Sequence, residues 1–168
     1  MHHIPNILTV LRILSVPCIL LLLDSPWGFR IFFIAGWSDI IDGYLARRFN
    51  WQSKLGGYLD PIADKLMMTS LYIALTMRGV FPPWLTYIVL GRDIAIALGG
   101  LILMQYTKLR DFPPTWPGKL STFCQGMTLL AAMAGYTHPY FGYVTAAFAV
   151  GSGLQYGWLR VQEIRVRV

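Results

Sequence analysis

The feature that most constrains this chain is a cluster of acidic residues inside a strongly apolar sequence. Residues 39 to 64, DIIDGYLARRFNWQSKLGGYLDPIAD, hold four of the eight acidic residues: Asp39, Asp42, Asp60 and Asp64. A carboxylate inside a membrane costs about 2.5–3.5 kcal/mol, so four that faced lipid would cost roughly 10 kcal/mol. We therefore expect the four carboxylates to face a polar cavity, where a divalent cation is the simplest group that neutralises them.

Composition supports a membrane setting for this cluster. The chain has 168 residues, which predicts one domain over residues 1–168. It is 55% hydrophobic and only 13% charged, with a mean hydropathy of +0.52, whereas soluble domains carry about 25% charged residues. The net charge of +6 indicates cytoplasmic loops that contact anionic lipid, and it does not indicate a nucleic-acid partner.

The apolar runs predict an all-α integral membrane bundle of about six transmembrane helices, with five or seven as open alternatives. Lysine and arginine gather in loops on one side, which places both termini and the carboxylate site in the cytoplasm. Arg12 interrupts the first run, where its side chain can reach the surface or the site. The predicted helices are Ile7–Leu23, Trp27–Arg48, Lys54–Met77, Trp84–Tyr106, Lys119–Tyr136 and Pro139–Leu159.

The spacing of the acidic residues favours a cation site. Asp39 and Asp42 are three residues apart and Asp60 and Asp64 are four apart, so each pair lies on one face of a helix. Carboxylate oxygens from two such helices can enclose a hard cation. The alternative is a helix-terminus loop with solvated charges, but Asp60 and Asp64 are followed directly by an apolar run, which that alternative leaves unexplained.

The run Asp39-x-x-Asp42-Gly43-x-x-Ala46-Arg47, eight residues, Gly56-x-x-x-Asp60-x-x-x-Asp64 resembles the signature of the CDP-alcohol phosphotransferase family. The resemblance extends from Pro5-Asn6 to about Thr122. It implies that a hydroxyl attacks a CDP-activated lipid and that CMP leaves, with two Mg²⁺ or Mn²⁺ ions as cofactors. It also implies metal ligands at Asp39, Asp42, Asp60 and Asp64, a catalytic base at Asp64, and nucleotide-binding elements at Gly43, Ala46, Arg47, Gly56 and Asn6.

The acceptor alcohol is less constrained. The chain resembles two subfamilies that use CDP-diacylglycerol: one takes phosphatidylglycerol (cardiolipin synthase) and one takes glycerol 3-phosphate (phosphatidylglycerophosphate synthase). The second usually has Arg-Glu where this chain has Arg92-Asp93, and a second arginine where it has Gly99, so the cardiolipin type is favoured. Candidate acceptor-binding cations, which alternatively form a loop on anionic lipid, are Arg92, Lys108, Arg110 and Lys119.

Adjacent helical residues point about 100° apart. We therefore expect Arg92 to face the cavity and Asp93 to find its partner elsewhere, with a structural ion pair to Lys65 or to another helix as the alternative.

Two alternatives to an enzyme are also consistent with these residues. One is an ion-coupled transporter, because intramembrane carboxylates also mark ion paths, and the other is a catalytically inactive scaffold. The carboxylates cluster at one level and in one half of the chain, which argues against the transporter, and their complete set argues against the scaffold. Further expectations are a homodimer and a multi-pass protein of the bacterial inner membrane.

Overall fold

The computed structural model describes residues 4–48, 54–106 and 116–165; over parts of these ranges, including 39–47 and 54–59, it describes the backbone alone. Within these ranges the chain forms helices and the turns between them, which confirms the all-α prediction. The helices are α1 (Ile4–Leu21), α2 (Pro26–Arg48), α3 (Lys54–Met77), α4 (Pro83–Tyr106), α5 (Trp116–Met133) and α6 (Pro139–Arg165).

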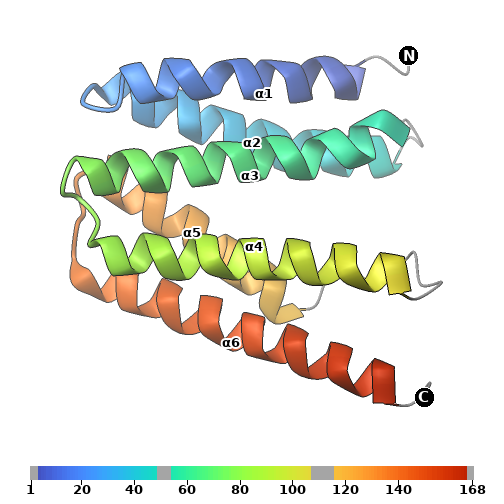
Figure 1. Cartoon of the computed structure of the whole chain (residues 1–168). Helices are drawn as coiled ribbons and strands as arrows, with labels where there is room; N and C mark the ends of the chain where they lie inside the picture. Colours follow the sequence, from blue (N-terminus) through green and yellow to red (C-terminus); the bar gives the residue numbers. More distant parts are fainter. Residues whose placement is uncertain (1–3, 49–53, 107–115, 166–168) are drawn as a thin grey trace. The chain divides into compact units, whose positions relative to one another are not determined.

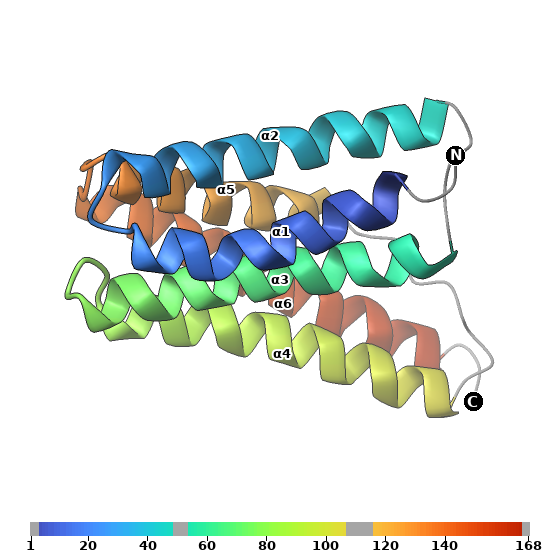
Figure 2. The ribbon, with the colours of Figure 1, turned by 90° about the horizontal axis from the view of Figure 1, so that it is seen from above.

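Contacts divide the chain into two compact units. Unit 1 comprises residues 1–78 and 129–136, and unit 2 comprises residues 79–128 and 137–168. In unit 1, α1, α2 and α3 run in alternating directions, and α1 packs against both of the others (Figures 1 and 2). The core of this unit includes Ile19, Leu71 and Tyr72, which are fully buried.

Tight contacts at the ends of the helices fix the geometry of unit 1. A Cβ atom on Gly28, in the first turn of α2, would lie 2.4 Å from the carbonyl oxygen of Leu22, so only glycine fits where the chain turns from α1 into α2. An ion pair between Arg78 and Asp24 ties the α1–α2 turn to the residue that follows α3.

In unit 2, α4 and α6 run in the same direction and pack against each other (Figure 1). Leu85 and Ala149 are fully buried and Val89 is nearly so. A Cβ atom on Gly142 of α6 would lie 3.3 Å from Leu85 Cδ2, so a small residue allows the two helices to approach closely. The part of α5 up to Thr128 belongs to the same unit.

The predicted bounds of α3 are confirmed at both ends, but other helix ends differ. Helix α5 begins at Trp116, three residues before the predicted Lys119, because proline is tolerated in the first helical turn and so Pro117 does not break the helix. Helix α6 continues to Arg165, beyond the predicted Leu159. No proline follows Pro139 in this segment, and basic residues near a helix C-terminus are favourable to its dipole.

Within the residues that the structure describes, none of the helices reaches the combination of length and apolarity that crossing a membrane requires.

Candidate functional site

The two acidic helix segments lie at the same end of unit 1. The second half of α2 carries Asp39 and Asp42, and the first half of α3 carries Asp60 and Asp64. Figures 1 and 2 show that the end of α2, the start of α3 and the start of α1 lie at this end. The fold therefore brings the backbones of both carboxylate segments to one place, as the spacing argument requires.

Of the four clustered aspartates, the structure describes the side chains of Asp60 and Asp64. Both are half-buried, and both have interactions within the chain. Ala63, between them, is fully buried, whereas Ile62 is exposed. Since residues four apart are neighbours on a helix surface, the two carboxylates lie side by side at the edge of the buried face of α3.

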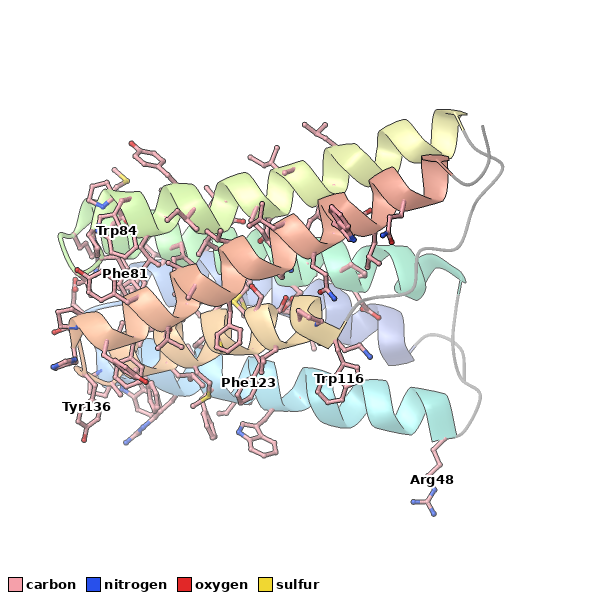
Figure 3. The ribbon with its side chains drawn as sticks, turned by 90° about the horizontal axis from the view of Figure 1, so that it is seen from below. Arg48, Phe81, Trp84, Trp116, Phe123 and Tyr136 are labelled. Atoms are coloured by element: carbon pink, nitrogen blue, oxygen red, sulfur yellow. The ribbon has the colours of Figure 1, made fainter. Side chains whose placement is uncertain are left out.

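The remaining predicted site residues of unit 1 lie in the helices at this end, and their side chains are outside the described set: Asp39, Asp42, Gly43, Ala46 and Arg47 on α2, Gly56 on α3, and Asn6 in the first turn of α1. Arg48 is described and projects beyond the end of α2 (Figure 3). Among the side chains that the structure describes, no three His, Cys, Asp or Glu residues gather as a metal site would need. With two of its four ligands outside that set, the metal site stays a prediction.

A partly open cavity of about 250 Å³ lies between α1 and α2. Its wall contains one charged residue, Arg12, which is only 6% exposed. Arg12 is therefore buried and does not extend to the surface, which was one of its two predicted positions. The Ser15 hydroxyl, also in the wall, donates a 2.7 Å hydrogen bond to the Arg12 carbonyl oxygen. The other lining residues are Leu11, Ile31, Ile34, Ala35 and Ser38.

This cavity was not predicted from the sequence. One signal was available: Ile31, Ala35 and Ser38 fall on one face of α2 at helical spacing, and the same spacing continues to Asp39 and Asp42.

In unit 2, Arg92 and Asp93 pair with each other, which corrects the expectation that they would separate. Arg92 Nη1 donates to Asp93 Oδ1 at 2.6 Å, and the two side chains are 8% and 11% exposed. The 100° between neighbouring Cβ directions does not prevent this contact, because the long arginine side chain bends back to its neighbour. Arg92 Nε also donates to Ser152 Oγ on α6 at 3.2 Å.

The same guanidinium connects α4 to the start of α5. Arg92 Nη2 donates to the carbonyl oxygen of Gly118 at 3.4 Å, and Gly118 precedes the exposed Lys119. The structure thus brings two of the four predicted acceptor cations to one region of unit 2. Lys108 and Arg110 lie outside the described residues, and the acceptor-binding role of all four stays a prediction.

Comparison with known proteins gives a consistent result. A sequence model of the family described as CDP-alcohol phosphatidyltransferase matches residues 2–153. The chain is 36% identical over 132 residues to a protein of Streptomyces coelicolor named cardiolipin synthase (CMP-forming), covering 71% of this chain and 60% of the relative. It is 35% identical over 136 residues to a probable phosphatidylglycerophosphate synthase of Mycobacterium tuberculosis, covering 76% of this chain and 64% of the relative.

A eukaryotic relative belongs to the same group. A cardiolipin synthase (CMP-forming) of Rattus norvegicus is 30% identical over 168 residues, covering 86% of this chain and 53% of the relative. The matches to these three relatives cover between about half and two thirds of each relative's length.

Proposed function

Because the chain belongs to the CDP-alcohol phosphatidyltransferase family, we propose that it transfers a phosphatidyl group from CDP-diacylglycerol to an alcohol and releases CMP. The observation that carries the proposal is the placement of both acidic segments, the second half of α2 and the first half of α3, at one end of unit 1. The complete motif from Asp39 to Asp64 lies inside the matched residues 2–153.

The donor set fits divalent cations. Asp39, Asp42, Asp60 and Asp64 would hold Mg²⁺ or Mn²⁺, two ions in our proposal, because carboxylate oxygens are the ligands that these hard cations prefer. Bound cations would supply charge neutralisation for the pyrophosphate and for the departing CMP.

The chain's own groups would complete the reaction. Asp64 would accept the proton of the attacking hydroxyl, a role that needs a carboxylate within hydrogen-bond reach of the acceptor. Gly43, Ala46 and Gly56 would let the nucleotide approach the helix backbones closely. Arg47 would contribute positive charge toward its phosphates, and Asn6 would approach from the first turn of α1.

We propose phosphatidylglycerol as the acceptor and keep glycerol 3-phosphate as the alternative. The relatives carry both names, so they do not separate the two. The neutral Gly99, where the glycerol-phosphate subfamily has an arginine, removes one cation that a dianionic acceptor would use. Arg92, Lys108, Arg110 and Lys119 remain the candidates for an acceptor phosphate.

We further propose that the helices lie in the bacterial inner membrane, with both termini and the site in the cytoplasm. Large apolar side chains are exposed along the helices, including Leu14, Ile94 and Leu154. In unit 2 the starts of α4 and α6 carry a stacked Trp84–Tyr143 pair with ring centroids 5.4 Å apart. Amphipathic aromatic rings of this kind are enriched where helices leave a bilayer.

The proposal is tested by CMP release from the purified protein in detergent with CDP-diacylglycerol and Mg²⁺ or Mn²⁺. Phosphatidylglycerol and glycerol 3-phosphate are offered separately, each with and without excess chelator. We expect release with phosphatidylglycerol that stops in chelator and returns when the cation is restored. Release with glycerol 3-phosphate alone would reverse the acceptor assignment, full activity in chelator would remove the metal assignment, and no release with any alcohol would contradict the transferase activity.

A further inference from the structure

The cavity between α1 and α2 has a mostly apolar wall. Leu11, Ile31 and Ile34 contribute large aliphatic side chains to it. Two of its polar residues are engaged within the chain, because the Ser15 hydroxyl donates to the Arg12 carbonyl oxygen and Arg12 has a further interaction of its own. Since the removal of apolar surface from water is favourable, such a wall favours an apolar occupant.

The cavity opens at an apolar surface of the two helices. Leu11 and Ile34 line it and are also 55% and 62% exposed, and Leu14, on the same face of α1 as Leu11, is 59% exposed. A chain can therefore lie partly inside the cavity and continue over this surface. The volume of about 250 Å³ is below the roughly 300–1,000 Å³ of pockets that enclose a whole small ligand, so the cavity fits part of a long apolar chain.

The position of the cavity on α2 connects it to the acidic segment. Its lining residue Ser38 directly precedes Asp39, and its lining residue Ile31 lies seven positions before Ser38, about 10 Å along the helix axis. Along α2 the wall thus changes from a hydroxyl next to the acidic segment to an aliphatic side chain at the far end. A glycerolipid has the same order of groups: phosphate, ester-linked glycerol and then hydrocarbon.

The chemistry of the transfer distinguishes the donor lipid from the acceptor lipid. In the donor, the phosphorus that is attacked is esterified directly to the glycerol that carries the acyl chains. In phosphatidylglycerol the attacking hydroxyl lies at the far end of the headgroup, so its acyl chains begin one headgroup further from the reacting atoms. A chain site that begins at the residue before Asp39, a proposed metal ligand, therefore fits the donor better.

We propose that the α1–α2 cavity holds the first part of one acyl chain of CDP-diacylglycerol, with the ester end of the chain beside Ser38 and the hydrocarbon directed toward Ile31. The remainder of the chain continues over the exposed surface at Leu11 and Ile34. This inference rests on the proposed transferase function and deepens it, because it makes the acyl part of the donor, and not only its nucleotide, a group that the protein recognises.

The test compares wild type with Ala35→Leu, which fills the cavity, and with Ala147→Leu, the same change at an exposed position of α6. Two quantities are measured: the KM for CDP-diacylglycerol from CMP release, and the inhibition constant of CDP-glycerol, which has no acyl chains. Each buried methylene contributes about fourfold to binding, so the displacement of about two methylenes should raise the KM of Ala35→Leu roughly tenfold or more. The inhibition constant of CDP-glycerol should not change, and Ala147→Leu should change neither quantity.

A second measurement does not depend on turnover. CDP-diacylglycerol with a photoreactive diazirine near the ester end of one acyl chain is irradiated with each purified protein, and the labelled peptides are identified by mass spectrometry. We expect label within residues 11–15 and 31–38, competed by unlabelled CDP-diacylglycerol, reduced in Ala35→Leu and unchanged in Ala147→Leu.

Three outcomes would overturn the inference: label confined to other segments, an equal rise of the KM and of the CDP-glycerol inhibition constant in Ala35→Leu, or a raised KM for phosphatidylglycerol in place of CDP-diacylglycerol. Absence of CMP release from wild type with any alcohol would contradict the proposed function instead. In that case the labelling pattern would still decide whether the cavity holds the acyl chain.

Discussion

The two units use buried polar groups in different ways. In unit 2 several buried polar side chains bond to one another: Arg92 pairs with Asp93 and bonds to Ser152, and Thr128 and Thr145 share a 2.6 Å hydrogen bond, although the fully buried Ser121 hydroxyl has no hydrogen-bond partner among the described residues. In unit 1 the buried Arg12 forms the wall of a cavity. The two acidic segments of unit 1 also meet at one end of its helices. The network around Arg92 in unit 2 therefore has the character of a closed scaffold, whereas unit 1 carries the proposed metal ligands and the proposed base.

The sign pattern of the charges explains the difference. Arg92 and Asp93 carry opposite charges, so each side chain compensates the charge of the other. Asp60 and Asp64 carry the same charge four residues apart, and such a pair is destabilising without a counter-charge. Inside an apolar chain, opposite charges can close a network, whereas like charges require a partner from another segment or from a ligand.

The largest effect on activity is expected for a change at Asp64, the proposed catalytic base. Asp64→Asn removes the proposed proton acceptor and one proposed metal ligand, so CMP release should fall by about 10²–10⁴-fold, the usual contribution of a general base. The measurement is initial-rate CMP release from the purified variant in detergent, after size-exclusion chromatography shows that it folds as wild type does.

Asp24→Asn is the matched control for that variant. Asp24 belongs to unit 1 as well, but its side chain is 85% exposed and pairs with Arg78 near the α1–α2 turn. Its removal should leave CMP release unchanged within twofold. Turnover like that of wild type in Asp64→Asn would remove the base assignment, and equal losses in both variants would point to a general effect of charge on unit 1.

Breaking the Arg92–Asp93 ion pair of unit 2 should lower the stability of the protein. Arg92→Gln leaves Asp93 buried without its cation, and breaking a buried ion pair from one side costs about 3–5 kcal/mol. The double variant Arg92→Gln/Asp93→Asn should lose less than the sum of the two single variants, because no unpaired charge remains. Thermal unfolding in detergent, read as Tm, measures all three.

Arg78→Gln is the surface counterpart, because its partner Asp24 is exposed, and exposed pairs contribute about 0–1 kcal/mol. The same four proteins also test the predicted role of Arg92 as an acceptor cation. If Arg92→Gln left Tm unchanged and raised the KM for the acceptor, Arg92 would be a ligand-binding residue and the closed-scaffold description of unit 2 would be wrong.

One glycine in each unit compares packing against a fixed backbone atom with packing against a movable side chain. In Gly28→Ala the new methyl would meet the backbone carbonyl of Leu22 at 2.4 Å, whereas in Gly142→Ala it would meet the movable Leu85 methyl at 3.3 Å. Overpacking against backbone costs about 1–3 kcal/mol, and each kcal/mol lowers Tm by about 2–4 °C in a chain of this size. We expect this loss of Tm for Gly28→Ala. We expect little change for Gly142→Ala, because replacing a helical glycine by alanine stabilises a helix by about 0.5–1 kcal/mol, which offsets the milder contact with Leu85.

Much of the fold followed from local sequence signals. Helix α3 begins and ends where predicted, because polar residues precede Lys54 and Gly79, with a left-handed φ of +73°, follows Met77. The predicted start of α5, Lys119, is three residues late, because proline and glycine are unfavourable inside a helix whereas Pro117 fits its first turn.

The site was predictable only in part. The shared end of α2 and α3 followed from the short connection between the predicted helices, since α2 ends at Arg48 and α3 begins at Lys54. The spacing of the aspartates predicts only which residues share a face of each helix. The α1–α2 cavity was not predicted, because large apolar residues also lie on other faces of both helices, so the shared face of Ile31, Ala35 and Ser38 did not stand out. The contact between Arg92 and Asp93 depended on a side-chain conformation, which spacing rules do not specify.

The smallest effect on Tm is expected when the hydrogen bond between Thr128 and Thr145 of unit 2 is removed. Thr145 is fully buried, and its hydroxyl lies 2.6 Å from that of Thr128 and 3.3 Å from the carbonyl oxygen of Cys124. Interhelical hydrogen bonds in membrane proteins average about 0.6 kcal/mol and reach about 1.7 kcal/mol, so Thr145→Val should lower Tm by only a few degrees.

The double variant Thr128→Val/Thr145→Val decides what that loss means. Removing both hydroxyls leaves neither threonine hydroxyl without the other, so the double variant should be closer to wild type in Tm than the sum of the two single losses. The double variant should also release CMP at the rate of wild type, because neither threonine belongs to unit 1, which carries the four clustered aspartates. Additive losses of Tm would show that the two hydroxyls act independently, and a loss of activity without a loss of Tm would show that the polar network of unit 2 takes part in the reaction.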